Sequence, residues 1–302
     1  MKQKILILLT LTTHLMYADV SSNVHTHSDG YIVSEAPWAP VPADYADVLF
    51  SRICTISDGL KVYALLGKPK HITKHKYPVI IYNRGGNREF GKIEEPPQLL
   101  HELIKSGFIV LASQYRGNDG SEGKEQFGGD DVHDVLNLIK TAHNLPYADT
   151  SNIFMVGRSR GDMMTYLALK EQPPIKAAVV IAGETDLFAG AKERPDFEAK
   201  VSSELIPNFA QNRQQEYEKR SVVFWPEKIN VPLLIIHGKN DWRVDINQVY
   251  TLVKKLKNLH KNFLFWQHEH GHGFPDELGH DTPNEMIPDI IAWIGSFIQY
   301  EF

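Results

Sequence analysis

A G-R-S-R-G sequence at 157–161 lies between an apolar run at 153–156 and a helix-forming run at 163–169. This pattern, with its strand and helix, is typical of the nucleophile elbow, a sharp turn that exposes a serine hydroxyl at the edge of a sheet. The two glycines are needed because backbone and helix pack too closely there for a Cβ atom. The pattern predicts a strand, a tight turn and a helix, with Ser159 as the nucleophile of a serine hydrolase.

A second apolar run, at 231–237, ends at Gly238 and is followed by Asp241. Open α/β sheets bind their ligands just past the carboxyl ends of parallel strands. In hydrolases with this elbow, the acid follows the serine along the chain. We therefore predict that Asp241 is the acid of a catalytic triad. Two alternatives are that Asp241 is a helix N-cap and that Asp245 takes the acid's role.

Three histidines, His268, His270 and His272, follow the next predicted strand. A serine hydroxyl becomes an effective nucleophile when an imidazole takes its proton, and a buried carboxylate holds that imidazole in the required tautomer. We predict that His272, within Gly-His-Gly-Phe, is the base, with His268 and His270 as alternatives. Together with Ser159 and Asp241 it completes a Ser-His-Asp triad.

The segment from His268 to His272 also matches H-E-x-x-H, a motif of zinc peptidases. That motif binds zinc on a helix, where both histidines project from one face. Here it follows an aromatic strand and contains Gly271, so we predict an extended segment and no metal site. A triad mechanism is self-contained, and no cofactor is predicted.

The predicted strand at 78–83 leads into a loop that contains Gly85 and Gly86. Such a loop leaves backbone N–H groups free to face a ligand. In hydrolases of this type, the oxyanion hole combines the N–H of the residue after the nucleophile with an N–H from a loop of this kind. We predict Arg160 as the first backbone donor and Gly85 or Gly86 as the second, with a plain flexible turn as the alternative for the loop.

From about Val48 to the C-terminus, these features resemble the catalytic domain of the prolyl oligopeptidase (S9) family of α/β-hydrolases. Further matching stretches lie at 56–62, 115–120, 130–132 and 232–244. The resemblance implies Ser159, Asp241 and His272 as nucleophile, acid and base. Two residues depart from the family pattern: Arg84, where His or Tyr usually precedes the glycine pair, and Asp162, where a small residue commonly follows the elbow. Large members carry a propeller domain, for which 302 residues leave no room.

Alternating strands and helices predict an α/β fold of the α/β-hydrolase type, with a doubly wound, mostly parallel sheet. We expect an irregular N-terminal segment at 19–47 and a catalytic domain at 48–302. Residues 184–224 are polar and interrupt the alternation, which predicts a lid-like insertion that shapes the substrate pocket; a solvated surface helix is the alternative. Strands are predicted at 48–66 (two, joined by a turn), 78–83, 108–113, 152–156, 176–182, 231–237 and 262–267, and helices at 130–142 and 248–259.

Lys2 and Lys4 precede a short apolar run, and Ala18 offers a small residue for cleavage. This predicts a signal peptide at 1–18 and an exported protein, periplasmic or secreted. The run is too short to span a bilayer, so no stable membrane span is expected after cleavage; an uncleaved anchor or a buried strand is the alternative. The net charge of −5 gives no sign of the basic surface that a nucleic-acid-binding protein needs, so we expect no nucleic-acid partner. The single cysteine, Cys54, is predicted to be an inert core residue.

We predict a serine-type peptidase that acts on short peptides through an acyl-enzyme. A carboxylesterase with the same triad is the alternative, and an inactive binding protein on this fold is a third. Four arginines lie in or near the predicted site loops, and each is a candidate partner for a substrate carboxylate or a surface charge: Arg84, Arg116, Arg158 and Arg160.

Overall fold

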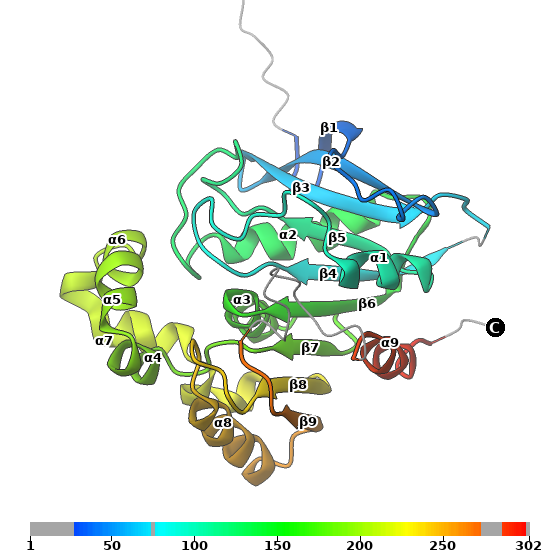
Figure 1. Cartoon of the computed structure of the whole chain (residues 1–302). Helices are drawn as coiled ribbons and strands as arrows, with labels where there is room; N and C mark the ends of the chain where they lie inside the picture. Colours follow the sequence, from blue (N-terminus) through cyan, green and yellow to red (C-terminus); the bar gives the residue numbers. More distant parts are fainter. Residues whose placement is uncertain (1–26, 74–75, 273–285, 300–302) are drawn as a thin grey trace, which may run out of the picture.

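The computed structural model describes residues 27–73, 76–272 and 286–299. They form a nine-stranded sheet in the order β1-β2-β3-β5-β4-β6-β7-β8-β9, shown in Figure 1. The pairings from β1 to β5 are antiparallel, and those from β5 to β9 are parallel. The strands are β1 Ile32–Pro37, β2 Val48–Ser57, β3 Leu60–Pro69, β4 Tyr77–Asn83, β5 Ile109–Ser113, β6 Ala148–Arg158, β7 Ala178–Ile181, β8 Leu233–Gly238 and β9 Phe263–His268.

The sheet is buried on both faces, which explains why its central strands are apolar runs rather than alternating patterns. Along β4, Val79 and Ile81 join one core, and Ile80 and Tyr82 join the other. The first core is covered by α2, α3 and α8, and the second by α1 and α9. These helices are α1 Gln98–Lys105, α2 Val132–His143, α3 Arg160–Lys170, α8 Ile246–Asn258 and α9 Ile287–Gly295.

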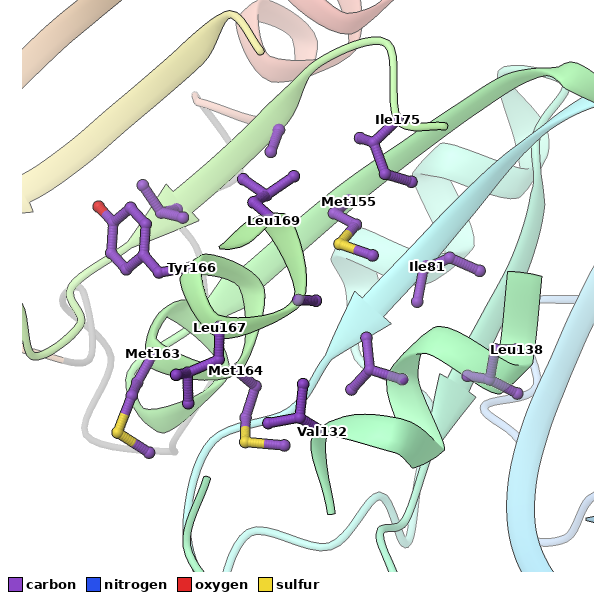
Figure 2. Close-up of a cluster of buried hydrophobic side chains, with 14 of the residues drawn as sticks. Ile81, Val132, Leu138, Met155, Met163, Met164, Tyr166, Leu167, Leu169 and Ile175 are labelled. Atoms are coloured by element: carbon purple, nitrogen blue, oxygen red, sulfur yellow. The ribbon is translucent and has the colours of Figure 1, made fainter. Parts of the chain in front are cut away.

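Helix α3, which follows the predicted elbow, is buried from Arg160 to Leu169. Figure 2 shows Met163, Met164 and Leu167 of this helix in one cluster with Val132 of α2. A helix enclosed on several sides is held firmly against the sheet, because close-packed interiors allow little displacement. The turn before α3 is therefore fixed by the core of the protein.

Between β7 and β8 the chain forms short helices, where the sequence predicts an insertion. Figure 1 shows α4 to α7 grouped beyond the carboxyl ends of the parallel strands. The pieces are α4 Leu187–Glu193, α5 Pro195–Phe197, a π-helix at Glu198–Ser202, α6 Ser203–Leu205, α7 Phe209–Arg220, and two 3-10 turns at Val222–Phe224 and Pro226–Lys228.

The predicted doubly wound, mostly parallel sheet is confirmed, and the described residues contain no propeller. The prediction of an irregular segment at 19–47 is wrong at β1, which pairs with β2. Strand β1 lies at the edge of the sheet and is largely exposed, so its sequence carries no apolar alternation. The sheet therefore begins before residue 48. Cys54 is buried, as predicted.

The predicted signal peptide at 1–18 lies outside the described residues. Within the residues that are described, no helix is both long enough and apolar enough to cross a bilayer.

Candidate active site

Ser159 occupies a strained turn between β6 and α3. Its backbone has φ 54° and ψ −123°, a region that non-glycine residues adopt mainly at functional sites. A Cβ at Gly157 would clash with the Gly161 carbonyl oxygen, and one at Gly161 would clash with that of Asn83. Neither position has room for a side chain. The Ser159 N–H donates to the Ile181 carbonyl at 2.8 Å, which ties the turn to β7.

The structure brings Ser159, Asp241 and His272 together. His272 Nε2 lies 3.0 Å from Ser159 Oγ, and His272 Nδ1 lies 2.9 Å and 3.1 Å from the two Asp241 oxygens. These are hydrogen-bond distances, and they place the imidazole between the hydroxyl and the carboxylate. Gly273 and Phe274, which complete the Gly-His-Gly-Phe sequence, lie outside the described residues.

The alternative acid and bases occupy other positions. Asp245 caps α8 by accepting a hydrogen bond from the Asn247 N–H at 2.7 Å. His268 ends β9, and its Nδ1 accepts from the His270 N–H at 3.2 Å. The H-E-x-x-H segment continues from this strand without forming a helix, so it lacks the geometry that the zinc motif requires.

Asp241 is held as an ionised acceptor. It accepts hydrogen bonds from the Arg243 and Val244 N–H groups at 2.8 Å and 2.9 Å. Burial raises the pKa of Asp241, but the hydrogen bonds from His272 and Val244 outweigh burial and hold this pKa below its usual range. In measured triads, an ionised carboxylate in this position fixes the imidazole tautomer and stabilises the imidazolium that forms during catalysis.

A second histidine, His237, lies behind the acid and was not predicted. Its Nε2 is 2.9 Å from the Val244 carbonyl oxygen and 3.3 Å from Asp241 Oδ2. Burial holds the pKa of His237 below its usual range, so the ring is neutral, and as the Nε2–H tautomer it donates to Val244. A histidine within an otherwise apolar buried strand is the sequence signal that marks it.

The predicted oxyanion donors lie beside Ser159. The Arg160 N–H begins α3, where the first N–H groups of a helix have no intrahelical partner, and the described residues supply no acceptor for it. The loop containing Gly85 passes Ser159 closely, because a Cβ at Gly85 would lie 3.2 Å from Ser159 Cβ and 3.8 Å from its Oγ. Gly86 has φ 72°, and a Cβ there would clash with the Phe90 carbonyl oxygen.

Sequence comparison decides the family of this chain. The sequence profile of the prolyl oligopeptidase family matches residues 98–299. The chain belongs to the prolyl oligopeptidase family. Its similarity to the uncharacterized peptidase YtmA of Bacillus subtilis is 32% identity over 236 residues, which covers 78% of this chain and 90% of that protein. This membership supports a serine peptidase, and therefore a hydrolase.

Solved structures show the same fold. The acylaminoacyl peptidase of Pyrococcus horikoshii superposes with a TM-score of 0.70 at 23% identity, over 83% of this chain and 42% of that one. A Pyrococcus furiosus esterase superposes with a TM-score of 0.66 at 18% identity, over 87% of this chain and 98% of that one. These likenesses establish the α/β-hydrolase fold alone. Against seven further curated relatives, this chain spans between 23% and 32% of the relative's length.

In this member of the prolyl oligopeptidase family, the Arg160 side chain ties the elbow to the glycine loop. The guanidinium is buried and donates to Asp131 at 2.5 Å, to the Gly86 carbonyl at 3.1 Å, and to Glu125. The second Glu125 oxygen accepts from the Arg88 N–H at 2.6 Å. One carboxylate therefore holds both the residue after the nucleophile and the far end of the glycine loop.

The two departures from the family pattern have structural roles. Arg84 is buried and donates to the carbonyls of Gly85 and Gln114 at 2.9 Å and 2.8 Å. Burial and the nearby Arg160 lower the pKa of Arg84 to about 10, so it remains charged at neutral pH. Asp162 accepts from the Ile181 N–H at 2.8 Å, and burial raises the pKa of Asp162 well above its usual range.

Three of the four arginines considered as carboxylate partners are committed inside the protein. Arg84 and Arg160 are described above, and Arg116 pairs with Asp134 and Asp58, each at 2.8 Å. The guanidinium groups of these three are buried and donate to other groups of the chain, so the surface-charge alternative is wrong for them, and their pairing with a substrate carboxylate stays a prediction.

A pocket of about 270 Å³ lies beside Ser159. The predicted insertion supplies one wall of it, through residues that include Phe197 and Val201. Glu184 also lines the pocket; burial, with a smaller contribution from Asp241, raises the pKa of its carboxyl to about 7 against the opposing effect of Arg194 and Arg160. The lining residues are Gly86, Asn87, Phe90, Phe127, Ser159, Arg160, Glu184, Arg194, Asp196, Phe197, Lys200, Val201 and Arg243.

Proposed function

We propose that this chain is a serine peptidase that cleaves short peptides through an acyl-enzyme, with Ser159 as nucleophile, His272 as base and Asp241 as the orienting acid. The observation that carries the proposal is the continuous hydrogen-bond chain from Ser159 Oγ through His272, at 3.0 Å, to Asp241, at 2.9 Å. Membership of the prolyl oligopeptidase family favours an amide bond as the substrate.

In the proposed mechanism, Ser159 Oγ attacks the scissile carbonyl carbon while His272 Nε2 takes the hydroxyl proton. The Arg160 N–H and an N–H of Gly85 or Gly86 stabilise the tetrahedral oxyanion. His272 then protonates the leaving amine, and the acyl-enzyme forms. Water, activated by the same imidazole, hydrolyses the acyl-enzyme and releases Ser159. The chain's own residues supply every proton transfer in this scheme, and no cofactor takes part.

The pocket supports a short substrate. Its volume of about 270 Å³ lies near the lower end of the range for small-ligand sites. Aromatic and aliphatic side chains share its lining with charged groups, so a substrate that combines an apolar group with a polar one suits it.

A carboxylesterase is the second candidate, favoured by the likeness of fold to the Pyrococcus furiosus esterase over 98% of that chain. The deciding experiment measures turnover of short aminoacyl and prolyl amides and matched p-nitrophenyl esters, with the Ser159→Ala variant alongside. Amide cleavage that is lost in the variant supports the peptidase, and cleavage of esters alone supports the esterase. If a fluorophosphonate, which reacts with active serine hydrolases, fails to label the folded protein, both the peptidase and the esterase proposals are wrong. The inactive binding protein is then the better description.

Export of the protein is a separate proposal that rests on Lys2, Lys4 and the apolar run after them. N-terminal sequencing of the protein recovered outside the cytoplasm tests it. A mature N-terminus near residue 19 is the expected result, and an intact Met1 in the cytoplasmic fraction contradicts it.

A further inference from the structure

Some of the positively charged side chains that line the pocket have a carboxylate partner, and others do not. Lys200 pairs with Asp196 at 3.0 Å, and the Arg160 guanidinium is held by two carboxylates. By contrast, Arg194 and Arg243 line the same pocket and have no carboxylate within ion-pair distance among the residues that the structure describes. Two guanidinium groups beside the nucleophile thus retain the capacity to bind an anion.

The two arginines come from different elements and meet at the pocket. Arg194 follows α4 in the insertion, and Arg243 lies in the loop after β8, two residues beyond Asp241. Arg194 Nη1 donates to the Arg243 carbonyl at 3.2 Å, which links the insertion to the triad loop. This contact holds the half-buried side chains on one side of the pocket.

Aromatic rings support both guanidinium groups. The Arg194 guanidinium carbon lies 4.8 Å from the centroid of the Phe197 ring. That of Arg243 lies 4.6 Å from the Trp242 ring and 5.8 Å from the Phe90 ring. A stacked guanidinium uses its face for the ring and keeps its edge N–H groups for a planar acceptor such as a carboxylate.

The electrostatic environment favours an anion at this position. Burial, together with the charges of Arg194 and Arg158, lowers the pKa of Arg243, so like charges are gathered here. Glu184 shares the pocket without forming an ion pair with Arg194 or Arg243, and its pKa of about 7 leaves it only partly ionised at neutral pH. An incoming carboxylate would relieve the repulsion between the arginines through charge-assisted hydrogen bonds.

We infer that Arg194 and Arg243 form a carboxylate-binding subsite, and that the preferred substrates are short peptides with a free carboxylate close to the scissile carbonyl. The inference rests on the proposed function, because it places this carboxylate in the pocket that contains Ser159. The carboxylate has two possible sources: an acidic side chain on the acyl side of the scissile bond, or the C-terminal carboxylate of a short leaving group.

The test uses matched substrates that differ only in that charge. One arm compares peptide p-nitroanilides with Glu or Gln before the scissile bond, and the other compares dipeptides with their C-terminal amides. We expect the carboxylate member of one pair to have a higher kcat/KM by about tenfold or more, as charge-assisted hydrogen bonds provide. The arm that shows this preference identifies the source of the carboxylate.

Variants then assign the preference to the two arginines. Arg194→Gln and Arg243→Gln should each lower the carboxylate-to-neutral ratio by about tenfold or more. Arg194→Lys keeps the charge but loses the planar guanidinium, which can donate two parallel hydrogen bonds to a carboxylate, so it should retain part of the preference. Lys192→Gln on α4 removes the same charge outside the pocket lining, and the ratio should remain at the wild-type value. Raising the salt concentration should shrink the wild-type ratio.

Equal kcat/KM within both pairs overturns the inference, as does a ratio that survives in both glutamine variants. Calorimetric titration of the Ser159→Ala variant with an acidic peptide and its neutral partner makes the test independent of turnover. Tighter binding of the acidic peptide by this variant supports the subsite even if no substrate of the panel is cleaved, in which case only the proposed activity fails. Equal binding both of Glu and Gln peptides and of a dipeptide and its C-terminal amide overturns the subsite.

Discussion

The arginines on the two sides of Ser159 are used in opposite ways. On the side of the glycine loop, which we call the fixed side, Arg84 and Arg160 are buried and donate to carbonyls and carboxylates of the chain. On the side of the insertion, which we call the open side, Arg194 and Arg243 are half-buried and supported by aromatic rings. The buried arginines hold the loop and the turn that carry the proposed backbone oxyanion donors, and a transition state is stabilised best by donors that are already fixed before reaction. Recognition of a substrate instead needs donors that remain available.

The largest effect is expected at the proposed triad, which the two sides share. Asp241→Asn should lower kcat by about 10⁴-fold, by analogy with measured triads, because the amide favours the wrong imidazole tautomer. Steady-state kinetics on the best amide or ester substrate measures the change.

Asp245→Asn is the matched control for that variant, since Asn also caps a helix well. It should leave kcat near the wild-type value. If the two variants lose activity equally, Asp241 has no special role in the reaction.

The next prediction concerns the buried arginine network. Arg160→Met leaves Glu125 and Asp131 buried without their cation, and breaking a buried pair in this way costs about 3–5 kcal/mol of folding free energy. Arg194→Gln removes an equal charge from the open side without breaking a buried ion pair, and it should cost only about 1 kcal/mol, the usual value of a hydrogen bond such as the one to the Arg243 carbonyl. Urea unfolding of both variants measures the contrast. Similar losses in the two would remove the distinction between the fixed and the open side.

Glu184 gives a prediction on pH. The pKa of its carboxyl is about 7 in the folded protein, against an ordinary 4.5. Between these two pH values, the folded protein keeps a proton that the unfolded chain releases. Stability should therefore fall as pH rises from the ordinary to the folded pKa. Because a glutamine amide stays neutral throughout, the stability of the Glu184→Gln variant relative to wild type should grow by about 3 kcal/mol between about pH 5 and about pH 8. A difference that stays constant with pH, measured by urea unfolding, argues against a buried carboxyl that titrates in this range.

The smallest effect should come from the aromatic support of the open side. Trp242 is 72% exposed and stacks with Arg243, and exposed cation–π contacts are worth about 0.5–1 kcal/mol. Trp242→Ala should therefore raise KM for acidic substrates by about two- to fivefold, with kcat near wild type. A KM increase of the same size for neutral substrates would show that Trp242 contributes general packing rather than orientation of the guanidinium.

The sequence predicts that the three triad candidates lie together, because its signals for them are local. Each triad candidate follows its own apolar run, and parallel strands place their carboxyl ends along one edge of the sheet. The sequence alone therefore predicts that Ser159, Asp241 and His272 lie close together, even though the conformations of the loops are not known. Strand β1 escapes prediction because an exposed edge strand is held by backbone pairing, which leaves no periodic pattern of side chains.

Side-chain pairing over long sequence separations is what the sequence does not reveal. Nothing in the residues around Glu125 indicates that it meets both Arg160 and the Arg88 N–H, because the contact depends on how three loops pack. The same holds for Arg194, which reaches the pocket through the path of the insertion. The arginines nearest the motifs are therefore the natural candidates for substrate contacts, and three of them are buried and bonded within the chain.

The insertion begins just after β7, and its far end comes back to that point, where the Val223 N–H donates to the Thr185 carbonyl at 3.3 Å. Its two ends therefore lie side by side, and the elbow and the glycine loop belong to other connections. An engineer can treat residues 184–224 as an exchangeable cassette, grafting a different helical segment between the same two strands to alter which compounds are accepted while the hydrolytic machinery is inherited unchanged.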